Sequence, residues 1–204
     1  MKLYLVRHGE TEHNRQHLVQ GQSQQGLTEL GLKQAAAAAR ILNLNEIVAL
    51  YSSPLKRAIE TASVIQTHGS PTHCTVSNLS ELNVGELDGL SSQEMRNRYP
   101  GFMATWDRNP GEAQLPGGES LAQVQSRAWE WVTNVAEQHT DEQIAAVSHN
   151  FTISTLICLV LKLPISSFRQ FRVDLGSVSA IEVTKHQHRL LLLNSTFHLN
   201  GLRS

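Results

Sequence analysis

The chain has 204 residues and a formal net charge of −1, with 40% hydrophobic and 17% charged residues. This composition is typical of a globular protein with one sizeable core, and it excludes a disordered chain. A nearly neutral chain has no general basic field for nucleic acid or an anionic membrane, so any anion site must be built locally from a few cations. We expect one domain over residues 1–204.

The two cysteines, Cys74 and Cys158, are too few for a disulfide framework, and their spacing matches no zinc motif. Both lie in apolar or strand-like runs, so we expect buried free thiols. The N-terminal segment lacks the long apolar run of a signal peptide, and no stretch approaches the length of a transmembrane helix. By elimination, we expect a cytoplasmic location.

Short apolar runs alternate with helical patterns along the chain. We expect strands at 3–6, 47–52, 74–77, 144–147, 178–183 and 190–193. We expect helices at 29–42, from Pro54 onward, at 92–99, at 119–139 and at 152–163. Thr28 is a candidate N-cap for the first of these helices, which contains five consecutive alanines. The alternation predicts a layered α/β fold with a mostly parallel sheet, and the Gly- and Pro-rich residues 80–118 suggest an inserted lid or cap.

Polar residues follow three of the expected strands. Arg7 and His8 follow the first strand, Arg57 comes shortly after the second, and His149 follows the strand at 144–147. Since the ends of parallel strands meet at one edge of a sheet, these side chains should face one crevice. Arginine forks match phosphate oxygens, and neighbouring helix N-termini add N–H donors, so the set predicts a phosphoryl site.

His8 is the candidate nucleophile. Nearby guanidinium groups disfavour its cationic form, and its second nitrogen is expected to donate to a backbone carbonyl in the Gly9 turn. Attack on phosphorus would give a covalent phosphohistidine, with charge on the phosphoryl oxygens stabilised by Arg7, Arg57 and a protonated His149. Glu81 is the candidate general acid for the leaving oxygen, and the same carboxylate would then activate water.

Residues 5–11 resemble the signature of the histidine phosphatase superfamily, in its phosphoglycerate mutase-like branch. The resemblance continues through residues 27–31, 52–62, 82–89, 116–120 and 147–149, so it covers almost the whole chain. It implies a three-layer α/β/α sandwich with a mostly parallel central sheet and a small cap segment at about 82–118. It also places the catalytic acid at Glu81 and implies chemistry without a metal or another cofactor.

The resemblance extends to the phosphate contacts. Asn14, Gln20 and Gly21 stand where the family places contacts of its phosphate loop. Many members have glycine after the second histidine, where this chain has Asn150, whose backbone N–H is still expected to face the phosphate. One of the cap arginines Arg96, Arg98 and Arg108 is expected to touch a distal anion of the substrate.

These features predict a phosphomonoester hydrolase that acts on small phosphorylated metabolites, with no nucleic acid or membrane partner. One alternative is an α-ribazole-5′-phosphate phosphatase of cobalamin synthesis, because residues 171–174 and 179–181 resemble the C-terminal pattern of such enzymes. The others are a phosphoglycerate mutase, which the short cap disfavours, and a non-catalytic phosphate-binding module. The oligomeric state is open, with a homodimer as one alternative.

Overall fold

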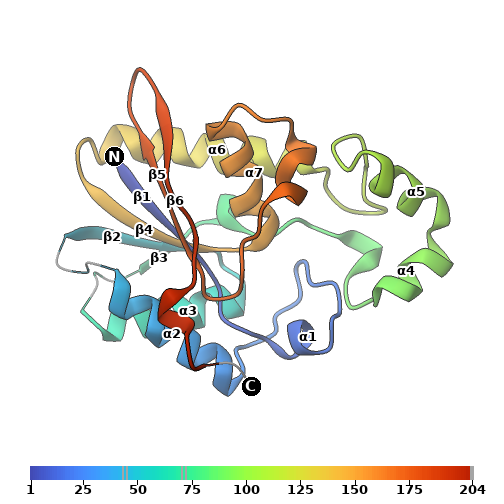
Figure 1. Ribbon diagram of the computed structural model, residues 1–204, viewed down its shortest axis with the longest axis horizontal. Helices are drawn as coiled ribbons and strands as arrows, with labels where there is room; N and C mark the ends of the chain where they lie inside the picture. The colour runs from blue at the N-terminus through green and yellow to red at the C-terminus, as the bar shows by residue number, and fades with distance from the viewer. Residues whose placement is uncertain (43, 45, 70, 72, 203–204) are drawn as a thin grey trace.

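The computed structural model describes residues 1–42, 44, 46–69, 71 and 73–202. Within them, six strands form one sheet in the order β3-β2-β4-β1-β5-β6 (Figure 1). Their bounds are β1 Lys2–Arg7, β2 Ile47–Ser52, β3 His73–Thr75, β4 Gln143–Ser148, β5 Val178–Val183 and β6 His188–Ser195. The four strands β3, β2, β4 and β1 pair in parallel, whereas β5 and β6 are antiparallel to their neighbours. The predicted mostly parallel sheet is therefore confirmed.

Helices cover both faces of the sheet, with α2 (Glu29–Ile41) and α3 (Lys56–Thr67) on one side and α6 (Leu121–Gln138) and α7 (Asn150–Val160) on the other (Figure 1). The central strand β1 shows why both faces need cover. Leu3 and Leu5 pack in the cluster under α6 and α7, while Val6 packs in the cluster under α2 and α3. Successive side chains of a strand point to opposite faces of the sheet. A strand whose side chains are apolar on both faces therefore requires helices on both sides, which gives a three-layer arrangement.

The middle of the segment between β3 and α6 forms a separate lobe that contains α4 (Ser92–Arg98) and α5 (Pro100–Arg108) (Figure 1). Helix α4 confirms the expected helix at 92–99. Helix α5 was missed by the sequence reasoning, which saw only a Gly- and Pro-rich region. Pro100 occupies the first turn of α5, where its missing N–H removes no helical hydrogen bond. The short helix α1 (Glu12–Arg15) lies in the loop after β1.

Two local expectations were wrong. Cys74 is exposed rather than buried, because it lies on the three-residue edge strand β3, whereas Cys158 is buried in α7 as expected. Pro54 lies before α3 rather than in its first turn, because the backbone is still extended at Leu55 and the helix begins at Lys56. Over the described ranges, no helix is both long enough and apolar enough to cross a membrane.

Candidate active site

The ends of the neighbouring strands β1 and β4 bring the two candidate histidines together. The backbone N–H of His8 donates to the carbonyl of Ser148 at 3.0 Å, so both strands end at the same level. The ring centroids of His8 and His149 are 5.1 Å apart. Both side chains are buried, and the exposed fraction is 3% for His8 and 0% for His149. The predicted convergence of strand ends is present.

His8 is held as a neutral imidazole with a defined tautomer. Its Nδ1 lies 2.7 Å from the carbonyl oxygen of Gly9, which fixes the proton on that nitrogen. Its Nε2 accepts a hydrogen bond from Nε of Arg57 at 3.3 Å, and therefore carries the lone pair. Burial lowers the pKa of His8 well below 6.5, and the positive charges of Arg57 and Arg7 lower it further. The lone pair that a nucleophile needs is thus present at neutral pH.

Arg57 lies between the two histidines and is completely buried. Its Nε is also 3.2 Å from Nδ1 of His149, and its two terminal nitrogens donate to the carbonyls of Ser23 (2.9 Å) and Gly21 (2.8 Å). Burial lowers the pKa of Arg57 to about 10, so the guanidinium still carries its charge at neutral pH. The loop after α1 therefore aims this cation at the centre of the site.

Three buried nitrogen atoms near this centre lack a hydrogen-bond partner among the described residues. They are Nε of Arg7, Nε2 of His149 and Nε2 of Gln20. Arg7 is anchored by its NH1, which donates to the carbonyl of Val173 at 2.7 Å. Buried donors are normally satisfied, so unpaired ones at a cationic centre fit a site that receives an anion.

The protonated state expected of His149 when it stabilises the phosphoryl oxygens stays a prediction. Burial lowers the pKa of His149 well below 6.5, with Arg57 as the next cause. Its Nδ1 accepts from Arg57, which leaves the proton on Nε2. His149 can therefore still donate one hydrogen bond to a phosphoryl oxygen, as a neutral N–H.

Glu81 lies in the loop before the cap and is only 5% exposed. Its carboxylate accepts hydrogen bonds from the backbone N–H groups of Leu82 (2.8 Å), Phe151 (3.2 Å) and Thr152 (3.3 Å). These bonds and the nearby arginines favour the ionised form, but burial outweighs them and raises the pKa of Glu81 above 4.5. A carboxyl group that keeps its proton to higher pH suits a general acid.

Arg127 of α6, which the sequence reasoning did not single out, fixes the segment that carries Glu81. Its NH1 donates to the carbonyls of Asn78 and Ser80, both at 2.8 Å, and its NH2 donates to the carbonyl of Glu81 at 3.0 Å. Its Nε forms an ion pair of 2.9 Å with Glu119, whose carboxylate also accepts from the N–H of Asn83 at 2.9 Å. One side chain thus braces the backbone on both sides of the candidate acid.

The expected phosphate-loop residues form the scaffold of that loop. Oδ1 of Asn14 accepts from the backbone N–H of Thr11 at 3.1 Å, and Oε1 of Gln20 lies 2.9 Å from the Thr11 hydroxyl. The N–H of Gly21 donates to Asp88, a second residue that the sequence reasoning missed, at 3.2 Å. Among the described residues, the buried Nε2 of Gln20 has no hydrogen-bond partner, so it is a donor that a phosphate could use.

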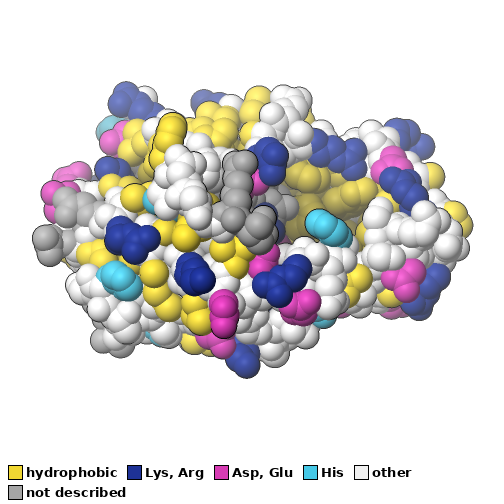
Figure 2. Space-filling view, turned by 60° about the horizontal axis from the view of Figure 1, so that its bottom comes forward, with side chains coloured by type: hydrophobic (Ala, Val, Ile, Leu, Met, Phe, Trp, Pro, Cys, Tyr) yellow, Lys and Arg dark blue, Asp and Glu magenta, His cyan; other side chains and the backbone are white. Residues whose placement is uncertain are grey.

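A cavity of about 300 Å³ opens beside Arg7. Its lining consists of Arg7, Asn150, Phe168, Arg169, Phe171, Arg172, Val173 and Asp174. Figure 2 shows the molecule hollowed between its main body and the α4–α5 lobe, with hydrophobic side chains in the hollow and Lys or Arg side chains around it. The three cap arginines of the sequence prediction are absent from the lining of this cavity. Arg96 instead pairs with Asp107 at 2.7 Å, and Arg98 lies over the ring of Tyr99.

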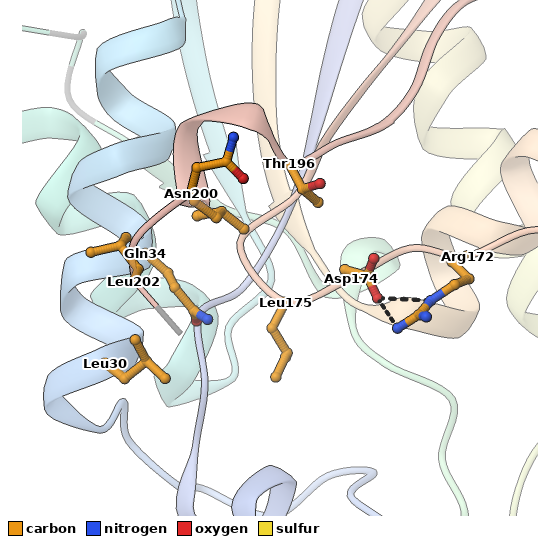
Figure 3. A pocket seen from close by; sticks show the side chains of 9 residues that line it. Leu30, Gln34, Arg172, Asp174, Leu175, Thr196, Asn200 and Leu202 are labelled. Carbon is orange, nitrogen blue, oxygen red and sulfur yellow. Dashed lines mark hydrogen bonds and ion pairs between the residues drawn. The ribbon is translucent and has the colours of Figure 1, made fainter. Parts of the chain in front are cut away.

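A second cavity, of about 530 Å³, lies between α2 and the C-terminal segment (Figure 3). Arg172 and Asp174, which also line the first cavity, form an ion pair of 2.7 Å at its edge (Figure 3). None of the candidate catalytic residues lines this second cavity, whereas Arg7 and Asn150 line the first one. In the part of the chain that is described, no group of three or more His, Cys, Asp or Glu residues is placed to hold a metal ion.

Comparison with known proteins agrees with this arrangement. A family model described as histidine phosphatase superfamily (branch 1) matches residues 3–196. Phosphoserine phosphatase 1 of Hydrogenobacter thermophilus is 33% identical over 199 residues, which cover 98% of this chain and 94% of that protein. The solved structure of Bacillus stearothermophilus YhfR superposes with a TM-score of 0.90 at 28% identity, covering 97% of this chain and 98% of that one. The α-ribazole phosphatase from Shigella flexneri superposes with a TM-score of 0.85 at 28% identity, covering 96% of each chain.

Proposed function

Because this chain belongs to the histidine phosphatase superfamily, branch 1, we propose that it hydrolyses phosphomonoesters of small metabolites through a covalent phosphohistidine on His8. The observation that carries the proposal is the state of His8. Its Nε2 lone pair lies at the same buried centre as Arg57, while Nδ1 is tied to Gly9. An imidazole in this state is ready for in-line attack at neutral pH.

In the first step, Nε2 of His8 attacks phosphorus while the bond from phosphorus to the ester oxygen breaks. Glu81 gives its proton to that oxygen, so the alcohol leaves neutral. Arg7, Arg57 and the Nε2–H of His149 stabilise the charge on the three non-bridging oxygens. The backbone N–H of Asn150 and the side chains of Asn14 and Gln20 complete the proposed phosphate contacts, and Gly21 contributes by orienting Arg57.

In the second step, the Glu81 carboxylate takes a proton from water as the water oxygen attacks phosphorus. The bond between phosphorus and Nε2 of His8 breaks, and inorganic phosphate leaves. The same carboxyl group thus serves as acid and then as base, so it must change protonation state within one cycle. Three backbone N–H donors stabilise its ionised form and burial stabilises its neutral form, so both forms are accessible.

The test is phosphate release from a panel of phosphomonoesters with EDTA present. The panel contains phosphoserine, α-ribazole-5′-phosphate and 3-phosphoglycerate. The His8→Ala variant serves as the negative control, and His186→Ala, which removes an exposed imidazole in the β5–β6 turn, is the matched control. Release that needs His8 but not His186 supports the proposal. Interconversion of 2- and 3-phosphoglycerate without phosphate release would replace it with a mutase, and binding without turnover would replace it with a phosphate-binding module.

The α-ribazole phosphatase alternative is favoured by the likeness to the Shigella flexneri structure, in addition to the C-terminal pattern at residues 171–174 and 179–181. A preference for α-ribazole-5′-phosphate within the panel would support it. One catalytic domain over residues 1–204 and a cytoplasmic location are also kept as proposals from the sequence. The homodimer stays an open alternative that light scattering of the purified protein would decide.

A further inference from the structure

The carboxylate of Asp88 clasps the loop that holds Arg57. Its Oδ1 accepts a hydrogen bond from the backbone N–H of Gly21 at 3.2 Å, and its Oδ2 accepts one from the backbone N–H of Ser23 at 3.1 Å. The carbonyls of the same two residues accept from the terminal nitrogens of Arg57, at 2.8 Å and 2.9 Å. Gly21 and Ser23 thus give their N–H groups to an anion and their carbonyls to a cation. The loop backbone links Asp88 to the phosphate site.

Backbone hydrogen bonds fix Asp88 beside this loop. Asp88 follows the short 3-10 helix Gly85–Leu87, at the base of the cap lobe. The two residues after it pair with the loop, since the N–H of Gly89 donates to the carbonyl of Val19 and the N–H of Val19 donates to the carbonyl of Leu90, both at 2.9 Å. A carboxylate held in this way can set the position of the loop rather than follow it.

The aim of the Arg57 guanidinium depends on the loop. Its Nε–H faces Nε2 of His8 and Nδ1 of His149, so the anchoring of its outer end rests on the carbonyls of Gly21 and Ser23. Among the described residues, no further acceptor takes the second N–H of either terminal nitrogen, so these donors remain for phosphoryl oxygens. A shift of the two carbonyls would therefore turn the fork away from the phosphate.

We propose that Asp88 is a positioning residue, which aims the Arg57 guanidinium at the phosphate through the backbone of Gly21 and Ser23. This inference rests on the proposed phosphatase function and adds a residue that acts through another. The charge of Asp88 works in the same direction. Burial lowers the pKa of Arg57 to about 10, and the negative charges of Glu81 and Asp88 oppose this lowering. Misplacing a catalytic group by about an ångström can cost about a hundredfold in rate.

The first test removes the charge of Asp88 and keeps its shape. In Asp88→Asn, an NH2 group replaces one acceptor oxygen and repels one of the two loop N–H groups. We expect kcat/KM for p-nitrophenyl phosphate to fall by about tenfold to about a hundredfold. Asp88→Glu, which keeps the carboxylate, should recover part of this loss. Glu86→Gln is the matched control and should leave kcat/KM unchanged, because Glu86 lies two residues away but accepts from the hydroxyl of Tyr99 in the cap lobe.

A double-mutant cycle separates the aiming of Arg57 from general packing. Arg57→Lys keeps the positive charge but lacks the fork that the two loop carbonyls hold. In that background, Asp88→Asn should change kcat/KM by no more than about twofold, because the group that Asp88 aims is gone. Equal losses in the wild-type and Arg57→Lys backgrounds would overturn the positioning role. An unchanged kcat/KM in Asp88→Asn alone would also overturn it.

The phosphatase proposal is judged separately, by the dependence of phosphate release on His8. If the wild-type protein turns over no ester, calorimetry with orthovanadate replaces kinetics in the same cycle. Binding that is weaker by about tenfold in Asp88→Asn, with little further loss when the substitution is made in Arg57→Lys, supports the positioning role. Equal affinities of the wild-type protein and Asp88→Asn, or an equal loss in both backgrounds, overturn it.

Discussion

The turn that carries His8 rests on a backbone contact that only glycine allows. Gly31 lies in the first turn of α2, and a Cβ atom built there would be 2.2 Å from the carbonyl oxygen of Glu10. A Cβ on Gly9 would be 2.3 Å from the carbonyl oxygen of Gly31. Real Cβ contacts do not become this short, so α2 and the catalytic turn must separate in a Gly31→Ala variant.

Two opposing effects set its magnitude. Alanine in place of glycine in a helix gains about 1 kcal/mol from helix propensity. Relieving the clash requires a backbone shift of roughly an ångström, and overpacking of this kind costs about 1–3 kcal/mol. Because the obstacle is backbone rather than a flexible side chain, we take the upper part of that range. The free energy of unfolding should fall by about 1–2 kcal/mol net, and kcat/KM by up to about a hundredfold, since a misplacement of this size at a catalytic group has such effects.

Gly101→Ala is the matched control. Gly101 is an exposed residue in the first turn of α5, and a Cβ there would meet nothing within 4 Å. This variant should raise the free energy of unfolding by a few tenths to about 1 kcal/mol and leave kcat/KM unchanged. Urea denaturation and steady-state kinetics on both variants measure the two quantities. If Gly31→Ala stabilises the protein as Gly101→Ala does and retains full activity, the backbone contact does not position the catalytic turn.

Three further results are expected. Glu81→Gln should slow alkyl phosphates by about 10²–10⁴-fold in kcat and p-nitrophenyl phosphate less, since that leaving group needs little protonation; equal losses would remove Glu81 as the acid. Arg127→Met should lower the free energy of unfolding, measured in urea, by about 3 kcal/mol, and it should shift the basic limb of the kcat–pH profile. If the basic limb does not shift, the role of Arg127 is purely structural. The pKa of His8 is lower in the native than in the unfolded state, so its contribution to the free energy of unfolding decreases as the pH is lowered below 6.5. When the free energy of unfolding is plotted against pH, the slope for His8→Asn should therefore be smaller than that of the wild type by up to about 1.4 kcal/mol per pH unit. An unchanged slope would mean that His8 is charged in the native state.

Much of the fold follows from local sequence patterns. The continuous apolar run at residues 3–6 predicted a buried strand. Thr28 followed by the alanine run predicted α2 with its N-cap. The same logic found His8, Arg57 and His149, because polar residues directly after buried strands are conspicuous. Glu81 was proposed as the general acid and then placed by the family resemblance, since a glutamate in a loop has no periodic signal of its own.

The remaining features depend on contacts that no local pattern encodes. Arg127 acts through backbone carbonyls 46 to 49 residues away, and Asp88 holds loop N–H groups 65 and 67 residues away. The lowered pKa of His149 results from complete burial beside Arg57, which the sequence does not reveal. The rings of Trp106, Phe151 and Phe168 meet although they come from α5, α7 and the 3-10 helix Ile165–Gln170, so they show no common spacing along the chain.

The central claim is a covalent phosphohistidine on His8, and rapid-quench intact-mass analysis tests it most directly. With p-nitrophenyl phosphate, the Glu81→Gln variant should form the intermediate readily but hydrolyse it slowly, because water then lacks its base. The protein should carry one added phosphoryl group, labile in acid and stable in base, located on His8 and absent in His8→Ala. Turnover without any phosphorylated protein, or a phosphoryl group on another residue, would contradict the account.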